Sequence, residues 1–144
     1  MSDSLTDLQS LIKTQIQAHA DLGSFQVFTE RDADLSRTVD NAISTYGIAA
    51  VVTDFGFTQA GGPNEYETEF SVKVKENRNV NAGGGDALGI TCAEVSLQIF
   101  LQLYDWEAAT MWGKARNLNL ETLQLEPEVI RDVSGSFRVV LNNN

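Results

Sequence analysis

The segment from residue 66 to residue 104 constrains the fold of this chain more than any other. It opens with strict alternation, in which every second residue belongs to the set Tyr66, Thr68, Phe70, Val72 and Val74. This period of two predicts a strand with one buried face. After a polar, glycine-rich stretch, residues 91–104 carry Leu97, Phe100 and Leu101 at helical spacing. Together the two patterns predict an α+β core in which helices cover one face of a sheet.

Length and composition place the chain among globular proteins. Its 144 residues, of which 42% are hydrophobic, suit one α+β domain over residues 1–144. The single Cys92 excludes an intramolecular disulfide. The first residues lack the basic flank and apolar run of a signal peptide, so we expect the chain to be cytosolic during assembly.

The charge of the chain is strongly negative. Twenty acidic residues against ten basic ones give a net charge of −10, and the first half carries most of it. Binding to nucleic acid by phosphate neutralisation needs a basic surface. We therefore expect no measurable binding to duplex DNA at physiological salt.

The remaining patterns complete the expected order of elements. Apolar spacing predicts helices over residues 4–22 and 34–46, with Thr91 capping the helix that follows residue 90. Strands are expected at residues 25–28, 48–53, 65–75, 118–125 (with a bulge) and 137–141, and loops at residues 55–65 and 77–90. Residues 105–113 fit either a helix or a turn. The fold class is α+β, with an antiparallel-rich sheet of four to five strands and two to three helices packed on it.

This arrangement predicts which side chains are buried. They are Val51, Phe70, Val72, Val74, Leu97, Phe100, Leu101, Val139 and Leu141.

No catalytic, cofactor or metal site is predicted from the residues. His19 has no second His or Cys nearby to share a zinc ion. Cys92 begins a helix, where its pKa could fall, but a small buried residue is the stronger interpretation. Gly83-Gly84-Gly85 matches neither the dinucleotide nor the Walker phosphate loop.

Three stretches carry a resemblance to a known family. They are Glu76-Asn77-Arg78-Asn79-Val80-Asn81, residues 97–106, and the pattern from Leu118-x-Leu120 to Phe137-x-Val139-x-Leu141. In this order they resemble the tail terminator and head–tail joining proteins of long-tailed bacteriophages, including the small tail proteins of Mu-like phages.

The resemblance implies a structural virion protein without enzymatic activity or cofactor. Such proteins form a ring, usually a hexamer, that caps the tail tube or joins it to the neck, and DNA passes the channel. The implied partners are copies of the chain itself and tail tube and neck proteins, with no membrane, and the implied location is the tail or neck of the virion after assembly in the host cytoplasm.

Candidate contact residues lie in the two long loops and on the outward face of the alternating strand. There the charge reverses from acidic to basic, so that different faces of neighbouring subunits could complement each other. The candidates are Phe55, Phe57, Glu67, Glu69, Lys73, Lys75, Arg78, Asn79 and Asn81.

Two other classes of protein stay open at this point. A small-molecule or peptide binding module could use the two long loops with Trp106 and Trp112. An enzyme of unknown type could use Asp32, Asp34 or Cys92.

Overall fold

The computed structural model describes residues 5–19, 26–30, 32, 34–53, 55–59, 61–62, 65–85, 89–108 and 114–140. Its elements follow one another along the chain as α1 (Leu5–Gln17), β1 (Val27–Thr29), α2 (Leu35–Tyr46), β2 (Ile48–Val52), β3 (Gly56–Gln59), β4 (Glu65–Glu76), α3 (Arg78–Asn81), α4 (Cys92–Leu103), β5 (Arg116–Gln124) and β6 (Val129–Val140).

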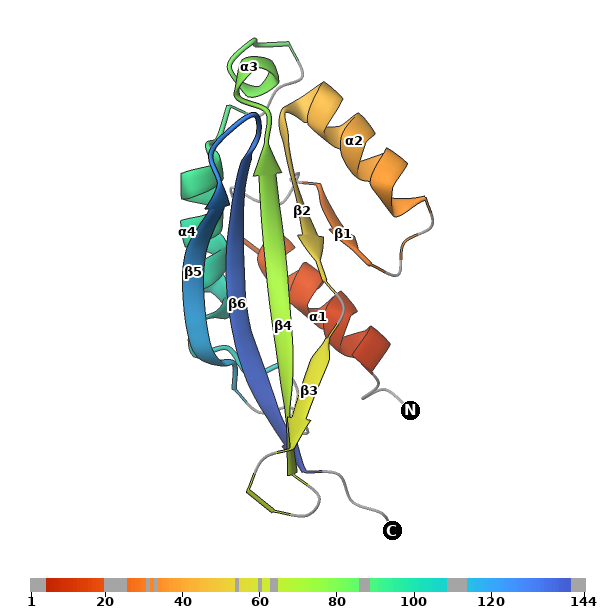
Figure 1. Ribbon diagram of the computed structural model, residues 1–144, viewed down its shortest axis with the longest axis vertical. Coiled ribbons are helices and arrows are strands. Elements are labelled where there is room, and N and C mark those ends of the chain that lie inside the picture. The colour runs from red at the N-terminus through yellow and green to blue at the C-terminus, as the bar shows by residue number, and fades with distance from the viewer. Residues whose placement is uncertain are drawn as a thin grey trace.

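The strands form a single mixed sheet with the order β1-β2-β4-β6-β5 (Figure 1). The short strand β3 pairs with the first part of β4, on the side where β2 pairs with its last part. The β1–β2 pair is parallel and the other pairs are antiparallel. The expected antiparallel-rich α+β fold is confirmed, with six strands and four helices in the described part of the chain.

The alternating strand lies at the centre of the sheet as β4. It pairs with β6 over its whole length, from Glu65 opposite Val140 to Glu76 opposite Val129. Its even-numbered residues from Thr68 to Glu76 are buried, and its odd-numbered residues lie on the opposite face. Burial of Phe70, Val72 and Val74 is therefore as predicted.

The main core lies between the sheet and helices α1 and α4, behind the sheet in Figure 1. Helix α1 contributes Leu8, Ile12 and Ile16, one turn apart, all at 0% exposure. Aromatic rings close one end of this core. The ring centroid of Phe137 lies 5.2 Å from that of Phe70 and 6.0 Å from that of Trp106, and the Phe137 and Trp106 rings are nearly perpendicular.

The buried stripe of α4 is not the predicted one. Thr91 caps the helix by accepting a hydrogen bond from the Glu94 amide at 3.2 Å, as expected. The helix then turns Val95, Ile99 and Leu103 into the core, whereas Leu97 and Leu101 are 49% and 61% exposed.

The reason for this error is that α4 is apolar on two sides. Both stripes satisfy the helical period, so spacing alone could not choose between them. Phe100 is only half-buried at the edge of the core. Val51 is half-buried under α2, and the side chains of residues 139 and 141 lie outside the described part.

Three segments form regular structure that the sequence did not indicate. Strand β3 occupies part of the predicted loop at 55–65, because β4 supplies its hydrogen-bonding partner. Helix α3 forms within the predicted loop at 77–90, since the Asn77 carboxamide oxygen accepts hydrogen bonds from the amides of Asn79 and Val80.

Strand β6 begins at residue 129 rather than 137; its Ser-Gly-Ser centre hides the alternation. A Cβ at Gly135 would lie 2.8 Å from the Leu118 side chain, so glycine is needed there.

Helix α2 lies on the opposite face of the sheet and covers only the β1–β2 side. Its Val39, Ala42 and Ile43 pack on Ala49 of β2 in a second, smaller core. The helix ends at Gly47, which has a φ of 86° that favours glycine. The same face of β4, β6 and β5 carries no helix among the described elements, and four of the nine predicted contact residues lie there.

Candidate interaction surfaces

The uncovered face of the sheet brings four of the predicted contact residues together. Glu67, Glu69, Lys73 and Lys75 occupy alternate positions of β4, so all four point to this face. Acidic residues lie at the β3 end and basic residues at the other, as the sequence predicted. A contact role for these side chains stays a prediction.

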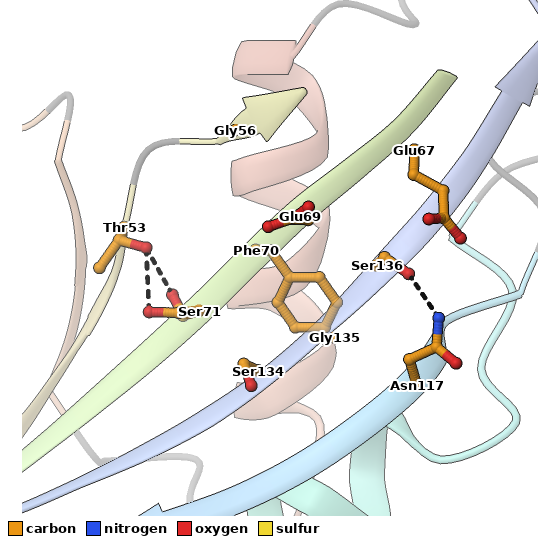
Figure 2. Close-up of a pocket in the computed structure, with 10 residues that line it drawn as sticks. All are labelled: Thr53, Gly56, Glu67, Glu69, Phe70, Ser71, Asn117, Ser134, Gly135 and Ser136. Carbon is orange, nitrogen blue, oxygen red and sulfur yellow. Dashed lines mark hydrogen bonds between the residues drawn. The ribbon is translucent and has the colours of Figure 1, made fainter. Parts of the chain in front are cut away.

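A polar hollow of about 450 Å³ opens on this face, shown in Figure 2. The hydroxyl groups of Thr53, Ser71 and Ser136 in its wall are already bonded within the chain. The Thr53 hydroxyl donates to the Ser71 carbonyl at 3.0 Å, and the Asn117 amide nitrogen donates to the Ser136 hydroxyl at 3.3 Å. Glu67 and Glu69 stand at its rim. Such a lining offers hydrogen bonds to a polar partner rather than an activated nucleophile.

A second hollow of about 400 Å³ lies between α2 and the sheet. Apolar side chains from α2, β2, β5 and β6 form much of its wall, among them Val39, Leu123 and Ile130. The charged residues of the lining balance, since Lys73 and Lys75 are offset by Glu30 and Asp40. Such a wall suits an apolar group rather than an anion. This hollow is the strongest structural support for the binding-module alternative.

The two phenylalanines of the predicted first loop have different environments. Phe55 is half-buried and packs against the main core. Phe57 lies in β3 and is 53% exposed. Its register partner is Thr68, whose side chain lies in the core layer, so Phe57 extends from the helix-covered side of the sheet.

The predicted second loop is anchored by a buried polar network that sequence reasoning missed. The Asn81 amide nitrogen donates to the Glu76 carboxylate at 2.7 Å and to the Ile90 carbonyl at 2.8 Å. The Asn81 oxygen accepts from the Gly89 amide at 2.9 Å, and Glu76 also accepts from the Cys92 amide at 3.0 Å.

This network changes the role of Asn81. At 5% exposure, its side chain ties the end of α3 to Gly89 and Ile90 and has no donor left for a neighbouring subunit. Arg78 and Asn79 are exposed on α3 and remain candidates for contact. The alternation of β4 places Glu76 on its buried face, where a carboxylate needs hydrogen-bond donors. This position of Glu76 is the sequence signal that could have indicated such a network.

The residues of the enzyme alternative are not brought together. Asp32 accepts a hydrogen bond from the Thr29 amide at 2.9 Å, and Asp34 begins α2 with a φ of 51°. Cys92 is fully buried in the main core, and its thiol lies 3.5 Å from the Val74 carbonyl. Desolvation by burial raises the pKa of the Cys92 thiol, which keeps it protonated. Among the described residues, no group of three or more His, Cys, Asp or Glu could hold a metal ion.

We expect Cys92 to react slowly with thiol reagents in the folded protein. Attack requires the thiolate, which burial disfavours, and access, which the core denies. Labelling with a chromogenic disulfide at pH 8 should be slow in buffer and complete within minutes in denaturant. Rapid stoichiometric labelling of the native protein would show that the Cys92 thiol at the start of α4 is accessible to the reagent.

The chain shares its fold with a chain from the virion of a native gene transfer agent particle. The two superpose with a TM-score of 0.60 at 12% identity, over 97% of this chain and 100% of that chain. Two structures from Akkermansia muciniphila, one without its transmembrane region, match at TM-scores of 0.34 and 0.33 with 7% and 8% identity, over 100% of this chain and 82% and 90% of theirs. Scores this low support no argument. No protein-family model and no curated protein matches the sequence.

The described helices are too short or too polar to cross a membrane.

Proposed function

We propose that this protein is a structural component of a virion tail or neck, where copies of it form a ring that caps the tail tube or joins it to the head. One observation carries the proposal: 97% of this chain superposes on the whole of a chain from a gene transfer agent virion. The three sequence stretches that resemble phage tail terminator and head–tail joining proteins point the same way.

The surfaces of the described residues suit such a role. Apolar side chains that a monomer would bury are exposed on α4, β3 and β5, where Leu101 is 61% exposed and Phe57 53%. Apolar exposure of this kind is typical of protein–protein contact. The net charge of −10 would keep DNA moving past a ring rather than bound to it. We therefore propose a structural rather than a catalytic role.

The composition of the native particle tests this function. Particles purified from a producing culture should contain the protein in a fixed copy number equal to that of a closed ring, for which we propose a hexamer. Quantitative mass spectrometry against the tail tube protein gives that number, and electron microscopy of the tail end gives its position. Absence from the particle, or one or two copies per particle, would contradict the proposal.

The second candidate is a binding module that uses the hollow between α2 and the sheet. Its support is the apolar wall of that hollow. Titration with short apolar peptides, monitored by the NMR shifts of Val39 and Ile130, distinguishes it. Saturable micromolar binding at this hollow, in a protein absent from particles, would favour the module.

A further inference from the structure

Among the described strands, β1, β3 and β5 lie at edges of the sheet. The β3 and β5 edges leave apolar side chains uncovered on their helix-covered side. At one edge, no described strand pairs with the outer side of β5 from Arg116 onwards. At the other, β3 pairs only with β4. Unpaired backbone at a sheet edge is a template for another strand.

Helix α4 extends past the β5 edge of the sheet (Figure 1). Its outer stripe includes Leu97, Leu101 and Tyr104, which are 49%, 61% and 67% exposed. Leu120 of β5 points to the same side, because its register partner Val133 lies in the core, and it is 39% exposed. A helix with apolar stripes on two sides normally buries both of them. One more strand beside β5 would cover this stripe.

Strand β3 has the properties of that missing strand. Its side chain Phe57 extends on the helix-covered side and is 53% exposed. Its direction also fits. Since β3–β4, β4–β6 and β6–β5 are all antiparallel, β3 of a second copy in the same orientation runs antiparallel to β5.

We propose that β3 of one copy pairs with β5 of the next copy, so that the sheet continues from subunit to subunit, head to tail. This inference rests on the ring proposed above and names the surfaces that close it. It leaves no free β3 or β5 edge in a closed ring, which a two-fold contact between identical edges would not achieve.

The register of this contact follows from the sheet. Gly56, Glu69, Ser136 and Arg116 lie at one level across a subunit. Just before Arg116, Lys114 already forms a bridge with Glu107 of the same chain. The β3 strand of the neighbour must therefore be displaced from that level towards later residues of β5. A displacement by an even number of residues keeps each side chain on its own face.

A displacement of about four residues meets both conditions. It places Phe57 opposite Leu120, over the outer stripe of α4, and Thr58 opposite Asn119 on the uncovered face. Spread over the four strands β3, β4, β6 and β5, this displacement is about one residue per strand. A stagger of one residue, about 3.3 Å, per strand spacing of about 4.8 Å tilts the strands by about 35° relative to the ring axis. This angle is within the range found in closed barrels.

Pairwise cysteine cross-linking tests this contact. In a Cys92→Ala background, Thr58→Cys and Asn119→Cys are combined in one chain; both residues are exposed. Directly opposed residues of paired strands have the Cα separation that a disulfide needs. Under mild oxidation at high protein concentration we expect covalent oligomers larger than dimers, while either single variant alone stays monomeric.

Two controls make the result specific. Thr58→Cys combined with Thr122→Cys should not link, because Thr122 lies on the other face of β5, opposite Arg131. Adding Leu101→Asp to the linking pair should lower the yield several-fold, and circular dichroism should show that the exposed site tolerates the change.

The outcomes are distinct from those of the particle experiment. Dimers from Asn119→Cys alone, links from the Thr122 pair, or no links in a folded double variant would each overturn the β3–β5 contact. Any of these results would leave a virion role, measured on particles, untouched. Absence from the particle would instead remove the proposed function.

Discussion

Ile99→Ala is expected to lower the free energy of unfolding by about 2–5 kcal/mol, whereas Leu101→Ala should change it by less than about 1 kcal/mol. The two residues lie two positions apart on α4. Ile99 is at 0% exposure in the core and Leu101 at 61% outside it. Removing a buried aliphatic side chain loses its transfer free energy and leaves a cavity, while an exposed one loses little.

Urea denaturation followed by circular dichroism measures both values. For a domain of this size the Ile99 variant should shift the midpoint by about 1–2 M, with an unchanged slope. Because isoleucine and leucine have side chains of the same size, both substitutions remove the same number of carbon atoms, and Leu101→Ala is the matched control. Equal costs at the two positions would mean that the outer stripe faces a core after all. The measurement should be made on monomers, since assembly would bury Leu101.

The second large effect is expected at Asn81. Asn81→Ala removes the hydrogen bonds to Glu76, Ile90 and Gly89 in a buried site, which should cost about 2–4 kcal/mol. Asn79→Ala, two positions away on the exposed side of α3, should cost less than about 0.5 kcal/mol and serves as control.

Asn81→Asp tests the electrostatics of the same site. It places a second carboxylate beside that of Glu76, and two like charges at this distance raise the pKa of one of them in the folded state. The protonated form is then favoured by folding, so the penalty is fully present at pH 7. It disappears as the pH falls towards the unfolded values of about 4.

The difference in unfolding free energy between Asn81→Asp and Asn81→Ala should therefore shrink or reverse between pH 7 and pH 4. Chemical denaturation at several pH values, with the unsubstituted protein as reference, gives this difference. A pH-independent difference would show that the two side chains do not interact.

The alternating pattern of β4 was enough to predict a central strand, because apolar side chains follow one another along one of its faces and mostly charged side chains along the other. Twelve residues paired along β6 leave no ambiguity of period. The helix cap at Thr91 was also readable, since capping depends on residues within one turn. The end of α2 at Gly47 was readable for the same reason.

The candidate contact residues were predictable only in part. Local alternation placed Glu67, Glu69, Lys73 and Lys75 on one face correctly. It could not show that Asn81 is buried, because its partners Glu76, Gly89 and Ile90 come together only when the chain folds. Nor could it show that the β5 edge is open, which depends on the order of strands in the sheet.

By itself, the sequence determined the α+β class, the central strand and the boundaries of α2 and α4, because these depend on period and on contacts a few residues apart. Tertiary structure alone decided which stripe of α4 enters the core, where β3 pairs, and which apolar side chains stay exposed. The physical reason is that α4 has apolar residues on both sides, with Ile99 inside and Leu101 outside. Burial of one stripe is chosen by the shape of the sheet beneath it, and no period in the sequence records that shape.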